Sequence, residues 1–299
     1  MYFTVHLLLL APVALAVVGS AVSRHLAPAA EVRVLTCLAA TAGAATLWGL
    51  SVLAFAGLMN VPQVRSRLDG DPRVLAAADP VPGGLGMLAA VVLGVVAVRL
   101  SFAWRRHATA RRALGVVRGA PAAGDLIVVT DDRADAYALP GRPGRIVVTT
   151  GMLRTLSAEE RAVLLAHERA HLTHRHHRYA AVAQIAVAIN PLLARLRDEI
   201  AFCIERWADE VAAERVGSRR LAMRSLARAA LATADLPAPP PALTYLRHQV
   251  TARVAALNGE RPASRWCRAW PAAGAVLVTF VALADVGVAL VRCVNALVP

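Results

Sequence analysis

Long uncharged stretches alternate with polar segments along this chain, and their lengths predict membrane-spanning helices. A helix needs ~20 apolar residues to cross a hydrocarbon core of ~30 Å. Four stretches reach that length, at about residues 2–23, 35–58, 81–104 and 269–291. The third contains Arg99 and the fourth contains Asp285, and otherwise both are uncharged. The pattern therefore predicts three spans before residue 105 and a fourth near the end of the chain.

The first stretch has a rival interpretation as a cleaved signal peptide. Ala14-Leu15-Ala16 resembles the small-residue cleavage site of such a peptide. The basic residues that should precede its apolar core are missing, so a retained helix is favoured.

The region between the third and fourth stretches has the pattern of a small α+β domain. Three short runs of mainly apolar residues predict strands, at residues 126–130, 136–139 and 145–149. The Pro- and Gly-rich segment 140–144 predicts a turn between the last two. Ser157 and Glu160 then form a capping-box pattern that begins a helix. Further helices are expected at about residues 198–215, 221–232 and 245–257.

One further apolar segment, residues 179–193, is uncharged but short for a membrane span. It fits a helix buried in the domain, and it also fits a segment that lies against the bilayer. The pattern alone does not separate these two interpretations.

Composition agrees with a membrane protein, because apolar residues make up 57% of the 299 residues and charged residues only 18%. Soluble domains are about half apolar and about a quarter charged. The net charge of +13 comes from Arg, which gathers at the cytoplasmic flanks of membrane helices. No basic stripe interleaved with aromatic residues is present, so a nucleic-acid partner is not expected.

The Arg-rich flanks also predict how the chain is oriented and divided. They favour a membrane region at 1–104, a cytoplasmic domain at 105–268, and a fourth span with a short external tail at 269–299. The expected fold is thus mainly α, with four transmembrane helices and a small cytoplasmic α+β domain in a cell membrane.

The chemistry in this domain is indicated by His167-Glu168-Arg169-Ala170-His171, an HExxH motif. Two histidines four residues apart share one face of a helix, where they can bind one Zn²⁺. Glu168 is then placed to act as general base on a metal-bound water. With 9 His in the chain, this motif arises by chance in on the order of one per cent of such sequences.

A catalytic zinc needs a third protein ligand, and an acidic residue after His171 is expected to supply it. The candidates are Asp198, Glu199, Glu205, Asp209, Glu210 and Glu214. Glu205 and Asp209 share a helix face, so that one could bind the metal while the other holds a ligand histidine. Their spacing does not decide which does which. The run from His174 to Arg178 is predicted to be the cationic end of a helix.

Residues 125–257 resemble the catalytic domain of membrane gluzincin metallopeptidases. The resemblance is carried by the strand pair 135–151, the zinc helix from Val163 to His171, the Glu205-Arg206-Trp207-Ala208-Asp209 element and the segment Arg253–Leu257. It implies that Glu205 is the third zinc ligand and that Asp209 supports a ligand histidine. Two related families fit, the HtpX/CAAX prenyl protease type and the BlaR/MecR type. The order of spans favours the second, although the external sensing domain of that type is not expected here.

We therefore expect a zinc endopeptidase with one Zn²⁺ per chain, acting on protein or peptide substrates at the cytoplasmic membrane face. The substrate is expected to pair with the strand around Ala136, Tyr137 and Ala138, because an edge strand offers unpaired backbone groups. A catalytically inactive zinc-binding or signalling protein is the main alternative, and a small transporter with a chance HExxH is the other. The sequence does not indicate the substrate.

Overall fold

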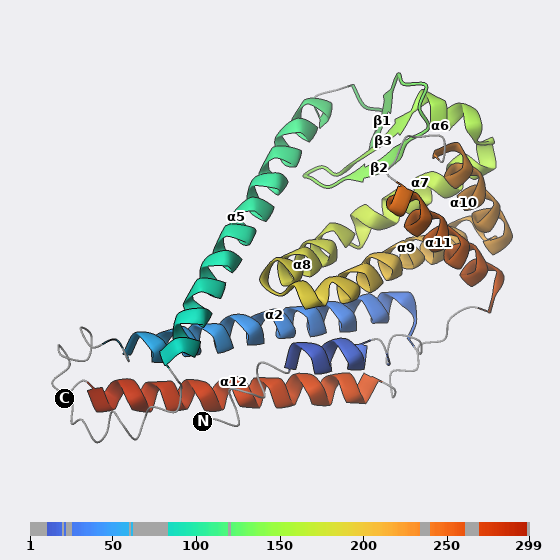
Figure 1. The fold of residues 1–299 in the computed structure, drawn as a ribbon. Helices are drawn as coiled ribbons and strands as arrows, with labels where there is room; N and C mark the ends of the chain where they lie inside the picture. Colours follow the sequence, from blue (N-terminus) through green and yellow to red (C-terminus); the bar gives the residue numbers. More distant parts are fainter. Residues whose placement is uncertain are drawn as a thin grey trace.

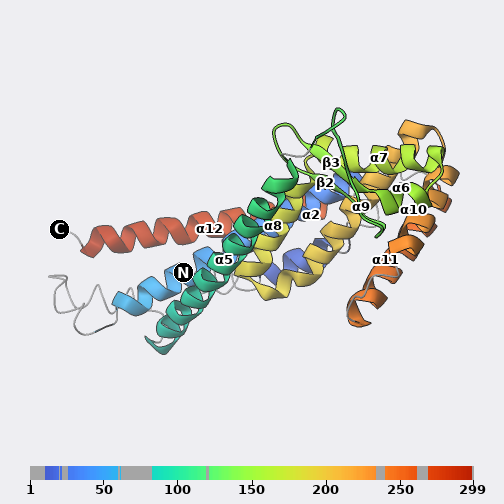
Figure 2. The same cartoon turned by 90° about the horizontal axis from the view of Figure 1, so that it is seen from above.

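The computed structural model shows a mainly helical protein with one small β-sheet (Figure 1). It describes residues 11–19, 21, 26–59, 61, 83–118, 121–233, 240–260 and 269–297. The sheet and the helices around it gather at the end of the molecule opposite the C-terminus, as Figures 1 and 2 both show. The long apolar helices make up the other end.

Three helices in the described part of the chain are long and apolar enough to cross a membrane. They lie within α2 (Pro28–Met59), α5 (Gly83–Arg118) and α12 (Trp270–Leu297). These correspond to the second, third and fourth expected spans. The sequence predicted four spans, and the described residues contain three. Most of the first predicted span, 2–23, lies outside the described residues. Its described residues 11–19 and 21 are helical.

The sheet has three strands, β1 (Leu126–Val129), β2 (Ala136–Leu139) and β3 (Arg145–Thr149), as the sequence predicted. Strand β3 is central, parallel to β1 and antiparallel to β2, so β2 forms an edge of the sheet. The inner strand is buried along Ile146–Thr149. After the short helix α6 (Thr150–Thr155), the chain enters α7 (Ala158–Thr173).

The start of α7 is held by the predicted capping box and by contacts with a later helix. The Ser157 N–H donates to Glu160 Oε2 at 2.9 Å, and the Glu160 N–H donates to Ser157 Oγ. The buried Glu160 carboxylate also accepts from Arg228, and Ser225 donates to its backbone carbonyl. Both partners belong to α10 (Arg219–Thr233), so one acidic residue fixes two helices.

Helices α8 (His176–Ile189) and α9 (Ala194–Val216) follow, joined by the short 3-10 helix η1 (Pro191–Leu193). They pack against α2 in the largest apolar core, which combines Leu35 and Leu38 of α2 with Ala186 of α8 and Ile200 of α9. Helix α11 (Pro240–Asn258) completes the bundle around α7, α9 and α10. Helices α8 and α9 of the domain thus share one core with the apolar helix α2.

Polar contacts add to this core where α2 begins. Arg206 of α9 lies 3.6 Å from the buried carboxylate of Glu31, measured from Nη1 to Oε2. The guanidinium of Arg33 lies over the ring of Trp207, 5.4 Å from its centroid. Two successive residues of α9 therefore contact the first turns of α2.

Two glycines let α2 and α5 cross in close contact. A Cβ atom added at Gly57 would lie 2.5 Å from the Gly86 Cα, and one added at Gly86 would lie 2.2 Å from the Gly57 Cα. No side chain fits at either position without moving a helix backbone. From this crossing, the two helices diverge (Figure 1).

We expect Gly86→Ala to destabilise the protein and Gly94→Ala, on the same helix, to be neutral or stabilising. A Cβ at Gly94 meets nothing within 4 Å, whereas at Gly86 it forces α2 and α5 apart at a cost of about 1–3 kcal/mol. Thermal unfolding of both variants in detergent measures the difference. Equal melting temperatures would contradict the close crossing.

Candidate metal centre

The residues of the HExxH motif lie on α7, opposite an acidic face of α9. His167, Glu168 and His171 come from one turn of α7, and Glu205 comes from α9. His167, His171 and Glu205 are the one group among the described residues whose donor atoms could hold a metal ion, with all of these atoms within 4.8 Å of one another.

The distances between these donor atoms suit one tetrahedral zinc. Two ligand atoms that each bind zinc at ~2.0–2.2 Å lie roughly 3.3–3.6 Å apart. The Nε2 atoms of His167 and His171 are 3.1 Å apart. Glu205 approaches both, with Oε2 at 3.5 Å from His167 Nε2 and Oε1 at 3.7 Å from His171 Nε2. The residues present therefore fit a zinc ion without a change of fold.

Asp209 contacts the other side of the His167 ring. Its Oδ1 lies 3.1 Å from His167 Nδ1, the nitrogen that points away from the other donors. A carboxylate at that nitrogen fixes the orientation of a ligand imidazole and increases its basicity. The two acidic residues that spacing could not distinguish thus lie at different nitrogens of one histidine.

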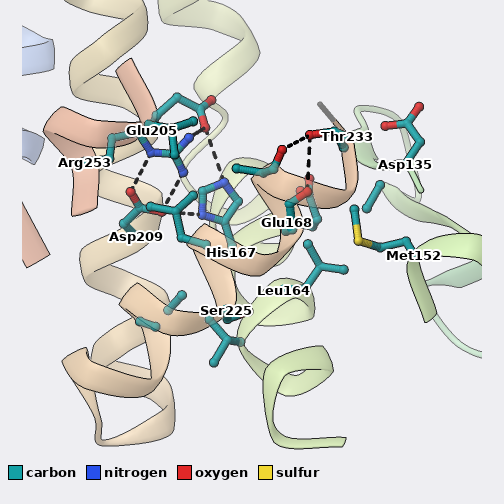
Figure 3. Close-up of a pocket in the computed structure, with 18 residues that line it drawn as sticks. Asp135, Met152, Leu164, His167, Glu168, Glu205, Asp209, Ser225, Thr233 and Arg253 are labelled. Carbon is teal, nitrogen blue, oxygen red and sulfur yellow. Dashed lines mark hydrogen bonds and ion pairs between the residues drawn. The ribbon is translucent and has the colours of Figure 1, made fainter. Parts of the chain in front are cut away.

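Arg253 of α11 contacts both Asp209 and Glu205. The sequence did not predict this role, although Arg253 belongs to a segment that resembles the membrane gluzincins. It donates to both Asp209 oxygens at 2.7 Å, and its Nη1 lies 3.1 Å from Glu205 Oε2 (Figure 3). Both Arg253 and Asp209 are nearly buried. The bidentate contact is therefore shielded from water and geometrically specific.

The carboxylates of the site fit a divalent cation, and the pKa values of the two ligand histidines differ. Ionised Glu168, Glu205 and Asp209 against one Arg253 leave two negative charges to be balanced. Burial alone would lower the pKa of His167, but its hydrogen bonds to Asp209 and Glu205 raise that pKa to about 10, so a metal ion at Nε2 would have to displace a proton. Burial lowers the pKa of His171 to about 4, so this ring is neutral, as a metal ligand must be.

Glu168 is buried beside the donor atoms but does not belong to their group. Figure 3 shows it on the side of His167 that faces Asp135 and Met152. Only 7% of Glu168 is exposed, and burial raises the pKa of its carboxyl to about 7. The backbone N–H of Ala138, in the edge strand β2, donates to this carboxyl. A cation at the donor atoms would favour its ionised form.

The prediction that His174–Arg178 form a cationic helix end is wrong for His176. Helix α7 ends at Thr173, and Arg175 has φ 55°, a left-handed conformation that interrupts the helix before α8 begins. This turn brings His176 Nδ1 to 3.0 Å from His171 Nδ1. The His176 ring is buried and packs on Trp207, and burial lowers its pKa to about 3, so it is neutral.

A pocket next to the donor atoms has a mixed lining. Its polar wall contains His167, Glu168, Glu205 and Arg253, and its apolar wall comes mainly from α10. The end of β2 at Asp135 and Ala136 reaches the same pocket, and Figure 3 shows Asp135 and Met152 at its far side. The pocket thus joins the edge strand to the metal-binding residues.

The sequence profile of peptidase family M48 matches residues 101–261, more than half of the chain. The chain therefore belongs to this family, whose members are metallopeptidases that typically use zinc. The match does not distinguish the BlaR/MecR type. No curated protein and no solved structure matched.

We expect the full chain to bind one Zn²⁺ and Glu205→Ala to lose it. Asp209→Asn should retain zinc with about 10–100-fold lower affinity, because it weakens the support of His167 and leaves Arg253 one acceptor oxygen on this side chain in place of two. Competition with a chromophoric chelator measures both affinities, and Asp198→Asn, on the same helix, is the control. A larger loss for Asp209→Asn than for Glu205→Ala would reverse the two roles.

Proposed function

We propose that this member of peptidase family M48 is a zinc-dependent endopeptidase that hydrolyses peptide bonds at the cytoplasmic face of a membrane. The observation that carries the proposal is the convergence of His167, His171 and Glu205 beside the buried carboxyl of Glu168. Two neutral or neutralisable imidazoles and one carboxylate are the donor set of a catalytic zinc.

In this proposal, each polar side chain has one task. Zinc held by the three donors would lower the pKa of a water molecule and polarise the carbonyl of the scissile bond. Glu168 accepts the proton of the attacking water and delivers it to the leaving amine nitrogen. Asp209 keeps the Nε2 of His167 directed at the metal, and Arg253 keeps Asp209 and Glu205 in place.

The number of donors favours catalysis over the alternative of an inactive zinc protein. A structural zinc site is closed by four protein ligands, whereas a catalytic site keeps one position open. Only three residues join the group within the described part of the chain. The pocket that borders these donors is further support, because a substrate needs access to the open position.

The edge strand β2 supports the expected place for the substrate. The Thr149 N–H donates to the Asp135 carbonyl, and hydrogen-bonded pairs alternate in an antiparallel ladder. The pairs are thus Asp135, Tyr137 and Leu139 with β3, and the backbone groups of Ala136 and Ala138 are directed away from it. An extended substrate can pair with the outward groups of Ala136 and with the Ala138 carbonyl, next to Glu168, which already accepts from the Ala138 N–H.

The membrane side of the proposal rests on charge and on the apolar helices. The Arg-rich flanks of residues 105–268 favour a cytoplasmic position for the catalytic residues. The BlaR/MecR-type arrangement remains a hypothesis within this proposal, since it requires a first span at 2–23, most of which lies outside the described residues.

We expect Glu168→Gln to bind zinc normally and to lose about 10²–10⁴-fold in kcat, because an amide cannot accept the proton of the attacking water. The measurement is turnover of a library of quenched fluorescent peptides by protein in liposomes, with zinc content determined on the same samples. Glu159→Gln, an exposed acid on the same helix, is the matched control and should keep full activity. Cleavage by Glu168→Gln at the control rate would rule out its role as the base.

We expect Ala136→Pro to lower kcat/KM by roughly 2- to 10-fold, the worth of one hydrogen bond. Proline removes an outward N–H of β2 without removing a bond to β3. Ala136→Ser keeps the N–H and serves as the control. Equal kcat/KM for both variants, with zinc bound in both, would count against substrate pairing at β2.

A further inference from the structure

The hairpin formed by α8, η1 and the first turn of α9 extends from the metal centre into the angle between α2 and α5 (Figure 1). A side chain at Gly43 of α2 would contact Ala186 and Ile189 of α8. Asn190, at the turn, donates to Thr46 Oγ1 of α2 at 3.1 Å. Gly43 and Thr46 lie near the middle of the candidate span Pro28–Met59. The turn of the hairpin is thus level with the middle of a membrane helix.

The polar backbone groups at this turn are bound by protein atoms. The carbonyl of Ala186 accepts from the Asn190 N–H, and that of Val187 accepts from Arg99 Nη2 at 2.9 Å. The Asn190 side chain accepts from the Leu192 N–H, and its carbonyl accepts from the Leu193 N–H. Irregular backbone at membrane depth requires such partners, because no water is available there.

Arg99 is the one charged residue of α5 between Gly83 and Trp104. Its guanidinium binds a carbonyl of the last turn of α8, where a helix presents unpaired carbonyls and the negative end of its dipole. A cation within a span is stabilised by such a contact. The charge inside α5 therefore has its partner in the hairpin.

The outer surface of the hairpin near its turn is mainly apolar, with Gln184 as an exposed polar residue one position before Ile185. Ile185 is 47% exposed and Leu192, at the turn, is 71% exposed. The lipid-facing side of α5 has the same character, with Val95 53% exposed. Exposed Leu and Ile side chains at a turn are unfavourable in water and favourable in hydrocarbon.

We propose that the turn of this hairpin is a re-entrant segment inserted into the hydrocarbon of the bilayer beside α2 and α5, with lipid acyl chains covering Ile185 and Leu192. Helix α8 has 14 residues and is about 21 Å long, so it enters the ~30 Å core without crossing it. The chain then returns through α9, where Leu196 meets Leu35 and Leu38 in the third turn of α2.

The charged residues after the turn agree with this depth. Arg195 pairs with Glu199 at 3.2 Å, and Arg197 pairs with Asp198 at 2.6 Å. They flank Leu196, and they are therefore level with the third turn of α2, about halfway between the start of the span and its middle. Paired and long-stemmed side chains at that level reach the polar interface.

The insertion also places the metal centre relative to the lipid. Helix α8 begins at His176, whose Nδ1 contacts the imidazole of His171. The metal-binding residues and the lipid are then separated by no more than the length of one short helix. The insertion itself does not depend on catalysis and holds even for an inactive chain.

The proposal is tested by nitroxide labels on the full-length chain in phosphatidylcholine vesicles, with its four native cysteines replaced by alanine. Leu192→Cys and Ile185→Cys carry the label in separate samples. Val95→Cys on α5 is the lipid reference, and Leu231→Cys on α10, 72% exposed, is the water reference. Zinc content reports whether each labelled chain is folded.

We expect the labels at 192 and 185 to collide several-fold more often with O₂ than with a water-soluble nickel chelate, as the label at 95 does. The label at 231 should show the reverse preference. Collision of the 192 and 185 labels mainly with the nickel chelate would overturn the proposal. Shielding of both labels from both reagents would also overturn it, because protein and not lipid would then cover the turn.

Discussion

The contact between Arg253 and Asp209 is the interaction on which the metal centre depends. It joins α11 to α9, and Asp209 in turn orients His167 of α7. Burying a guanidinium and a carboxylate is costly, and the cost is recovered only when every hydrogen-bonding atom has a partner. Here Arg253 reaches Glu205 as well, so one cation holds the carboxylates of both residues. Without it, the carboxylates of Glu205 and Asp209, about one helical turn apart, would repel each other.

This network explains which parts of the site could be predicted from the sequence. The spacing of His167 and His171 implies a shared helix face, and the capping box implies where that helix begins. Glu205 and Asp209 are equivalent by the same rule, because both lie on one face of α9. Only the distance between α7 and α9 distinguishes them, and that distance is set by packing. Arg253 lies 44 residues beyond Asp209, and no local periodicity connects the two.

His176 shows a different limit of sequence-based reasoning. It lies five residues after His171, so on a continuous helix its ring would point well away from that residue. The left-handed conformation of Arg175 interrupts the helix and returns the ring to His171. A non-glycine residue in that conformation gives no distinct signal in the sequence. The spans, in contrast, were predictable because hydrophobic length alone determines them, apart from α5, which continues as a helix to Arg118.

Helix α9 contacts the metal centre on one side and a membrane helix on the other. Glu205 faces the donor atoms, while Arg206 and Trp207, the next two residues, contact Glu31 and Arg33 of α2. Glu205, Arg206 and Trp207 are consecutive residues of one helix, so a displacement of the two residues that contact α2 also displaces Glu205. If α2 spans a membrane as proposed, a tilt of this helix in response to bilayer thickness would displace Glu205, the proposed third zinc ligand. Since misplacement of a reacting group by about 1 Å can cost ~10²-fold in rate, the mechanical state of the lipid would then become an input to the proposed hydrolysis.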